Sequence, residues 1–164
     1  VASIFISRWD VAVAGQVPAS LTNTLGLAIG AKAYHDYRVL MDSPRWQRAF
    51  NAGARPQRLL FASTGTKDPK ASDILYVKGL AAPLTVNTLP EATLKAFADH
   101  GEFGAMVPPD GGDAAAVLDQ FQAAGIDLAA LASKLQDDGA ASFVRSWREL
   151  LGQLAARSVA VQAG

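Results

Sequence analysis

The chain has 164 residues, of which half are hydrophobic and 18% are charged, and its 15 acidic and 15 basic side chains give a formal net charge of zero. This length suits one folded domain of ordinary globular composition. A net charge of zero argues against a nucleic-acid or membrane-surface role built on bulk electrostatics, and no apolar stretch approaches the ~20 residues of a membrane span. The absence of cysteine excludes disulfides, thiolate nucleophiles and cysteine-based metal sites.

Metal and cofactor chemistry find little support in the sequence. The two histidines, His35 and His100, lie far apart along the chain, so we expect no histidine metal cluster and no cofactor. His35 stands between Tyr34 and Tyr37 in a helical pattern, which favours a surface or packing role for its side chain. The lack of cysteine and of a recognisable signal peptide is compatible with a cytoplasmic protein.

Three short apolar segments predict β-strands, at residues 1–6, 58–63 and 84–88. The first reads as a strand that is buried on both faces of a parallel sheet, and such a strand needs a neighbour on each side. Polar residues follow each strand, at the edge where open α/β sheets and (β/α) barrels bind their ligands.

Helical patterns separate these strands. The first spans residues 21–41 with Ser20 as the predicted cap, and the second starts at Pro44 with Ser43 as the N-cap and stops near Gly53. Further helical turns are predicted at residues 71–79 and 90–99, where His100 and Gly101 end the helix. This alternation of strand and helix predicts parallel strands joined by right-handed crossovers.

After Gly101 the strand pattern stops, and the loop EFGAMVPPDGGD leads into helical segments predicted at residues 113–124, 127–136 and 140–154, followed by a loose tail, SVAVQAG. The last helix carries an apolar stripe that we expect to pack on the body of the protein, because aromatic stripes at helical spacing usually belong to a core. The residues of this stripe are Phe143, Trp147, Leu150, Leu151 and Leu154.

The segment ASTGTKDP, residues 62–69, follows the second predicted strand and is the strongest candidate for an anion site. The hydroxyls of Ser63, Thr64 and Thr66, the backbone around Gly65 and the ammonium of Lys67 could together hold an oxyanion. The alternative is a polar turn with a solvated Lys67, because loops of this composition are common.

Arg8 follows the first strand and could meet the same anion, since neighbouring loops converge at one edge of the sheet. The alternative is an ion pair with Asp10. Ser3 shares its parity with Val1 and Phe5 and is expected to face inward. Asn87, within the third strand, is either a hydrogen-bonded core residue or a residue that faces the site.

Several stretches of the sequence together resemble the transaldolases, in particular the long subfamily that includes fusions to glucose-6-phosphate isomerase. The stretches are VASIFISRWD, AKAYHDYR, SPRWQRAFNAGARPQRLLFASTGTKDPKASDILYVKGL, TVNTLPEATLKAFADHG and LQDDGAASFVRSWRELL. The resemblance implies that the chain is the C-terminal portion of a (β/α)8 TIM barrel, namely strands six to eight plus the terminal helices. Residues 1–100 would then form a partial barrel, and residues 101–164 a helical segment that packs on it.

The resemblance also implies an activity of the pentose phosphate pathway, the transfer of a dihydroxyacetone unit between ketose and aldose phosphates through a Schiff base. Four residues fall at phosphate-binding positions of this family: Ser3 and Arg8 in the sixth-strand motif, Ser63 after the seventh strand, and Lys67 as a second cation. The stretch KGLAAPLT departs from the more acidic segment of relatives, at a peripheral turn.

The family takes its catalytic aspartate, glutamate and Schiff-base lysine from the first, third and fourth strands, so the resemblance assigns no catalytic residue to this chain. None of its six lysines lies in a predicted strand. We therefore expect the isolated chain to bind sugar phosphates through its phosphate site and to be inactive. The expected partner is the set of missing N-terminal barrel strands or another copy of the chain, and neither nucleic acid nor membrane. The alternative function is a catalytically inactive, self-associating half-barrel that acts as a sugar-phosphate-binding or structural module.

Overall fold

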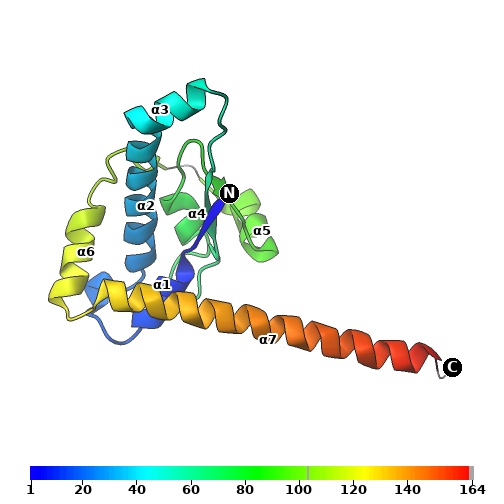
Figure 1. Ribbon diagram of the computed structural model, residues 1–164. Helices are drawn as coiled ribbons and strands as arrows, with labels where there is room; N and C mark the ends of the chain where they lie inside the picture. Colours follow the sequence, from blue (N-terminus) through cyan, green and yellow to red (C-terminus); the bar gives the residue numbers. More distant parts are fainter. Residues whose placement is uncertain (103, 163–164) are drawn as a thin grey trace. The chain divides into compact units, whose positions relative to one another are not determined.

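The computed structural model describes residues 1–102 and 104–162, with side chains up to residue 158 (Figure 1). The chain divides into two compact units, Val1–Ile126 and Asp127–Gly164, and each is described by itself. The expected division into a partial barrel, residues 1–100, and a helical segment, residues 101–164, stays a prediction.

The first unit is an α/β unit built around a small parallel sheet. Its elements, in chain order, are β1 (Ala2–Phe5), α1 (Ser7–Val13), the 3₁₀ helix η1 (Ala19–Leu21), α2 (Leu25–Asp42), α3 (Pro44–Asn51), β2 (Leu59–Ala62), α4 (Leu75–Gly79), β3 (Val86–Asn87), α5 (Glu91–His100) and α6 (Ala114–Ala123).

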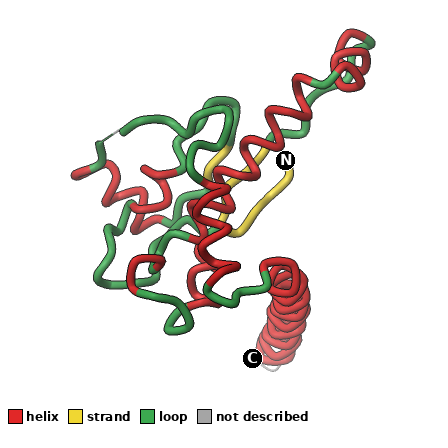
Figure 2. Tube along the Cα trace, turned by 90° about the vertical axis from the view of Figure 1, so that its left-hand side faces the viewer, coloured by secondary structure: helices red, strands yellow, loops and turns green. Residues whose placement is uncertain are grey.

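The three predicted strands are confirmed, each slightly shorter than expected, and they pair in the order β1-β2-β3. Both pairings are parallel, so each connection crosses over through helices (Figure 2). Ser3 pairs with Leu60, and Leu60 pairs with Val86. Because register partners of a parallel sheet project to the same side, these three side chains share one face and Ile4 and Phe61 share the other.

Within the described residues of this unit, the packed core lies on the face that carries Ile4 and Phe61. The core there joins strand residues to α2, α4 and the loop before α6, and its fully packed members are Ile6, Tyr34, Leu59, Phe61, Tyr76, Leu80 and Val107. On the opposite face, Ser3 is exposed and Leu60 and Val86 are half-buried. The sheet of this unit therefore has one packed face and one open face.

Strand β1 is not buried on both faces, contrary to the expectation for residues 1–6. It pairs only with β2, and Val1 is 65% exposed. Burial begins toward the end of the segment, at Ile6, which is fully buried in the core. The apolar run is thus a strand in which only one end and one face are packed within this unit.

The sequence reading missed helix α1, which starts directly after β1. Its buried residues are Ser7, Asp10 and Val13, spaced three apart on one face. Two of these three are polar, so the buried face of α1 carries no apolar periodicity that could have revealed it. The residues expected to form a loop after the first strand are therefore helical.

Helix α2 starts at Leu25, and Ser20 does not cap it. Ser20 lies within η1, and Thr24, the N-cap residue of α2, makes no side-chain capping bond. The prediction for α3 is confirmed, because the Ser43 hydroxyl accepts a 3.2 Å hydrogen bond from the amide of Trp46 and Pro44 occupies the first turn. Helix α6 packs against α2 within the first unit.

The second unit consists of one helix, α7 (Leu128–Gln162). The carboxylate of Asp127 caps it by accepting hydrogen bonds from the amides of Ala129 (3.0 Å) and Ala130 (2.9 Å). The predicted break after residue 136 is wrong, because Gly139 lies inside the helix, where a single glycine costs only about 1 kcal/mol. The expected loose tail is also helical as far as Gln162, and residues 163 and 164 lie outside the described residues.

The apolar stripe of α7 lies on one continuous helix, and its side chains are exposed within this second unit. Phe143 and Trp147 are 61% and 60% exposed, and the three leucines of the stripe are also exposed. The packing of this stripe on the body of the protein stays a prediction. Within the part of the chain that the structure describes, no helix has the length and apolar character needed to cross a membrane.

Candidate anion-binding site

The ends of β1 and β2 are joined by two serines. The Ser7 and Ser63 hydroxyl oxygens lie 2.8 Å apart, and the Ser7 amide donates a 3.0 Å hydrogen bond to the Ser63 carbonyl. Ser7 is almost completely buried, whereas Ser63 is half-buried. This pair fixes the carboxyl edge of the sheet, where the sequence predicted a ligand site.

Ser63 has an unusual backbone conformation, with a φ of 55°. A residue with a Cβ atom in the left-handed region costs about 1–2 kcal/mol, and such strain is concentrated at functional sites. The contacts with Ser7 hold Ser63 in this conformation.

Arg8 follows Ser7 in the first turn of α1, and its guanidinium carbon lies 4.3 Å from the centre of the Phe5 ring. Phe5 shares the open face of the sheet with Ser3, so Arg8 is held over the carboxyl end of that face. The structure shows no ion pair between Arg8 and Asp10 among the described residues, and Asp10 takes its partners from other elements.

Ser3 and Lys67 lie apart from this corner. Ser3 is in the middle of β1 and exposed on the open face, on the same side as Phe5. That Ser3 faces the interior of a barrel stays a prediction. Lys67 is exposed and lines a cavity of about 320 Å³ together with Asp10, Asp68 and Tyr76. Ser3, Arg8 and Ser63 do not line this cavity. The structure thus groups Arg8 with Ser63 through Ser7, whereas Lys67 lines a cavity that these three residues do not line.

All three hydroxyls expected to bind an anion have a partner within the protein, and that of Ser63 is the Ser7 hydroxyl. Thr64 is fully buried, and its hydroxyl donates to the Asn87 side-chain oxygen (2.8 Å). The Thr66 hydroxyl donates to the Ser72 carbonyl (2.7 Å). Only Ser63 of the three keeps its hydroxyl at the edge of the sheet. Asn87 is therefore a hydrogen-bonded strand residue, which decides between the two interpretations of its role.

Asp10 is the buried carboxylate that connects α1 to two other helices. Its side-chain oxygens accept hydrogen bonds from the amides of Leu25 (2.9 Å) and Gly26 (3.0 Å) at the start of α2, and from the Tyr76 hydroxyl of α4 (2.8 Å). Asp10 thus supplies the capping group that Thr24 does not. Sequence reasoning missed this residue because the cap comes from a segment 15 residues earlier.

The environment of Asp10 changes the titration of both partners. Burial raises the pKa of the Asp10 carboxyl, although the hydrogen bonds from Tyr76, Gly26 and Leu25 act in the opposite direction. Burial and the adjacent Asp10 carboxylate raise the pKa of the Tyr76 phenol far above its ordinary value. Tyr76 is therefore a permanent hydrogen-bond donor at neutral pH.

A second carboxylate holds the Lys67 loop against the segment that leads into α2. The Asn23 amide donates a 2.8 Å hydrogen bond to Asp68, whose other oxygen accepts from the amide of Lys70 (2.9 Å). The Lys70 amide and Asn23 lower the pKa of the Asp68 carboxyl. The loop is thus tied down immediately after Lys67.

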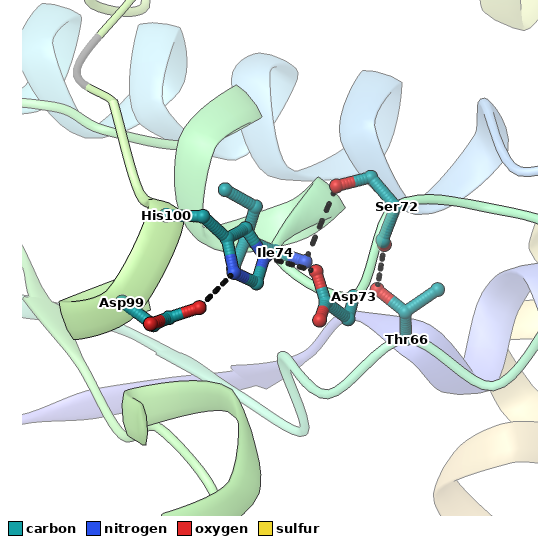
Figure 3. Close-up of polar contacts among 6 residues, drawn as sticks. All are labelled: Thr66, Ser72, Asp73, Ile74, Asp99 and His100. Atoms are coloured by element: carbon teal, nitrogen blue, oxygen red, sulfur yellow. Dashed lines mark hydrogen bonds and ion pairs between the residues drawn. The ribbon is translucent and has the colours of Figure 1, made fainter. Parts of the chain in front are cut away.

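His100 ties the far end of the same loop to α5 (Figure 3). Its Nε2 lies 3.0 Å from an Asp73 carboxylate oxygen, and its Nδ1 lies 3.2 Å from Asp99. The carboxylates of Asp73 and Asp99 raise the pKa of the His100 imidazole. On the other histidine, Nδ1 of His35 lies 3.1 Å from the Pro109 carbonyl oxygen, a packing contact with the loop before α6.

No lysine of the chain occupies a strand or a buried position. The six lysines are all exposed: Lys32, Lys67, Lys70, Lys78, Lys95 and Lys134. Three of them pair with acidic residues on their own helices, as Lys32 does with Asp36 (2.6 Å) and Lys95 with Glu91 (2.6 Å). Among the described residues, no group of three or more His, Asp and Glu side chains could hold a metal ion.

The fold and the site together define an α/β protein whose parallel strands direct hydroxyl and guanidinium groups toward one edge of the sheet. The sequence model of the transaldolase/fructose-6-phosphate aldolase family matches residues 1–154. The chain belongs to this family.

Curated relatives agree with this assignment. The chain is 45% identical to a transaldolase of Parafrankia sp. (strain EAN1pec) over 159 residues, which cover 92% of the chain and 43% of that relative. It is 44% identical to the transaldolase of Thermobifida fusca (strain YX), and 44% identical to that of Mycobacterium tuberculosis (strain ATCC 25618 / H37Rv). These matches cover 94% and 92% of the chain but only 44% and 43% of the relatives. The chain thus spans less than half the length of the curated relatives it matches.

Proposed function

We propose that this chain is the C-terminal portion of a transaldolase and that it supplies the phosphate-binding end of the active site. In this proposal β1, β2 and β3 are strands six to eight of a (β/α)8 barrel. The open sheet face that carries Ser3 and Phe5 would then be the barrel interior. The observation that carries the proposal is the position of Arg8, held over the end of this face beside the Ser7–Ser63 pair.

The chemistry of these groups suits the terminal phosphate of a sugar. A guanidinium offers several donors in a fixed plane to phosphate oxygens, and a serine hydroxyl adds a directed hydrogen bond. In a transaldolase, this end of the site would anchor the ketose or aldose phosphate. The binding energy of the remote phosphate would hold the carbonyl carbon in position for the reaction. Ser3 and Lys67 are proposed to complete the site, Ser3 from within the sheet and Lys67 from the following loop.

The Schiff base itself is proposed to form outside this chain. A Schiff-base lysine needs an environment that keeps its amine neutral at working pH, which burial provides. The six lysines are exposed, so none has that environment within this chain. The residues of the chain would bind and orient the substrate, and the isolated chain would not transfer the dihydroxyacetone unit.

The test is the substitution Arg8→Ala in a whole transaldolase that contains this chain. The loss of a charged phosphate contact should raise KM for fructose 6-phosphate at least tenfold, since hydrogen bonds to charged groups contribute about 1.5–3 kcal/mol. Lys95→Ala, which removes an exposed cation paired on its own helix, is the matched control and should leave KM unchanged. An unchanged KM in the Arg8 variant would refute the assignment.

The second candidate function is a self-associating half-barrel without transaldolase activity, which binds sugar phosphates or acts as a structural module. The open sheet face and the unpaired side of β1 favour it, because exposed strand edges pair readily with other chains. Light scattering of the chain in solution distinguishes the two. A compact dimer supports the half-barrel, whereas a monomer that binds the dye ANS strongly supports a portion of a larger barrel.

A further inference from the structure

Helix α1 carries Arg8 and has only seven residues, with no side-chain cap at its N-terminus. So short a helix has little stability of its own, and tertiary contacts must fix its position. The contacts available on its buried face come mainly from two polar residues, Ser7 and Asp10, which lie directly before and two residues after Arg8.

Of these two, Asp10 makes the contacts that reach farthest. Its carboxylate joins α1 to the first turn of α2 through two amides and to α4 through the Tyr76 hydroxyl. The approach of α2 is so close that a Cβ atom on Gly26 would lie 2.7 Å from an Asp10 carboxylate oxygen. Three helices therefore meet at one carboxylate, and α1 has little room to shift or rotate.

We propose that Asp10 is a positioning residue for Arg8. By locking α1 against α2 and α4, it keeps the Arg8 guanidinium stacked on Phe5 and aimed over the open sheet face before substrate arrives. An arginine on a loosely held helix would have to be ordered on each binding event, at a cost in affinity. The inference rests on the proposed function, since it gives Arg8 the role of phosphate contact.

Tyr76→Phe is the sharpest probe of this role, because it removes one hydrogen bond to Asp10 and leaves the packing of the ring in place. Tyr34→Phe is the matched control, because Tyr34 is equally buried in the same core. Its hydroxyl accepts a 3.4 Å hydrogen bond from the Arg38 guanidinium of its own helix and does not contact Asp10. Asp10→Asn is a second probe that keeps the shape of the side chain. All variants are made in the whole enzyme and assayed for KM and kcat with fructose 6-phosphate.

The expected result is a rise of about fivefold in KM for Tyr76→Phe and Asp10→Asn, with kcat within about twofold of the parent and no change in KM for Tyr34→Phe. Combination with Arg8→Ala separates positioning from general stability. If Asp10 acts through Arg8, then Tyr76→Phe causes no further rise in KM once Arg8 is alanine. Substitutions at independent residues add their effects on KM. The absence of a further effect would therefore show that Asp10 and Arg8 are coupled.

Two results overturn the inference alone. One is an unchanged KM for Tyr76→Phe while Arg8→Ala raises KM, and the other is a full fivefold effect of Tyr76→Phe that persists in the Arg8→Ala background. An unchanged KM for Arg8→Ala itself is a different result, which refutes the proposed function and the inference together. If Asp10→Asn does not fold, Tyr76→Phe decides the matter on its own.

Discussion

The hydroxyl of Tyr76 donates a 2.8 Å hydrogen bond to the carboxylate of Asp10, which lies 66 residues earlier in the chain. Both side chains are buried, at 1% and 7% exposure. The same carboxylate caps α2, so one acidic residue closes the corner at which α1, α2 and α4 meet. The stability of this corner and the position of Arg8 depend on this residue.

Replacing Asp10 with alanine should therefore be costly. The change leaves the Tyr76 hydroxyl and the amides of Leu25 and Gly26 without an acceptor, and each buried unpaired donor costs about 1–3 kcal/mol. We expect a loss of about 3 kcal/mol in the free energy of unfolding, measured by urea denaturation with circular dichroism. Asp119→Ala removes an exposed carboxylate of α6 and should change stability by less than about 0.5 kcal/mol. Equal effects of the two substitutions would show that the Asp10 contacts contribute nothing.

Two glycines of α2 offer a matched comparison of steric room. A Cβ on Gly26 would lie 2.9 Å from the carbonyl oxygen of Ile6, the N-cap residue of α1, besides its clash with Asp10. The backbone at Ile6 or that of α2 must therefore move. A Cβ on Gly30 would meet the ends of two side chains, Leu80 at 2.7 Å and Ile6 at 3.3 Å, and no backbone atom is among its three nearest neighbours. We expect Gly26→Ala to destabilise the chain by about 2 kcal/mol and Gly30→Ala by much less, because the Cβ on Gly26 meets a backbone atom and the one on Gly30 meets side-chain ends. The gain of about 1 kcal/mol in helix propensity applies to both positions. Thermal unfolding of both variants checks the order, and the reverse order would contradict the described approach of α1 and α2.

Ser63 allows a test of backbone strain at the candidate site. Its φ of 55° suits glycine, so Ser63→Gly should be more stable than Ser63→Ala by about 1 kcal/mol. Both variants lose the contact with the Ser7 hydroxyl, so the difference reports on the backbone alone. At Thr66, where φ is not positive, the order should reverse and alanine should be the more stable replacement. The same order at both positions, by urea denaturation, would refute a strained Ser63.

His100 should make the stability of the chain depend on pH. Asp73 and Asp99 raise its pKa in the folded state above the ordinary value of 6.5, so the folded protein binds the proton more tightly than the unfolded chain. The stabilisation from this group is complete below about pH 6.5 and is lost as the pH rises through the raised pKa. The difference in unfolding midpoint between the parent chain and His100→Gln should shrink over that range.

An NMR titration of the His100 ring checks the cause. Asp73→Asn should move the pKa of His100 down toward its ordinary value, because Asp73 makes the larger contribution to the shift. A pKa that Asp73→Asn leaves unchanged would show that the Asp73–His100 contact drawn in Figure 3 does not form in solution.

Patterns of neighbouring residues in the sequence were enough to predict the three strands and the start of one helix. Apolar runs located the three strands, and a serine followed by proline located the start of α3 at Ser43. The start of α2 could not be found in this way, because its cap is a carboxylate from another helix. Helix α1 could not be predicted for a related reason, because its buried face is mainly polar. The hydrogen-bond partners of these polar groups come from distant parts of the sequence.

The sequence predicted where the candidate site lies better than it predicted which side chains are available there. The position of Arg8 and Ser63 at the carboxyl edge of the sheet follows from the strand pattern. The hydroxyls of Thr64 and Thr66 could not be ruled out from the sequence, because their acceptors lie on β3 and at Ser72. The burial of Asp10 could not be predicted either, because an acidic residue two positions after Arg8 suggests a surface ion pair.

We propose that this chain holds the phosphate of the substrate while the Schiff base forms elsewhere in a whole transaldolase. The most direct measurement is borohydride trapping of the whole transaldolase with fructose 6-phosphate, followed by mass spectrometry of its peptides. We expect a modified lysine in a peptide outside these 164 residues. A modified Lys67, or modification of any of the other five lysines of the chain, would contradict it.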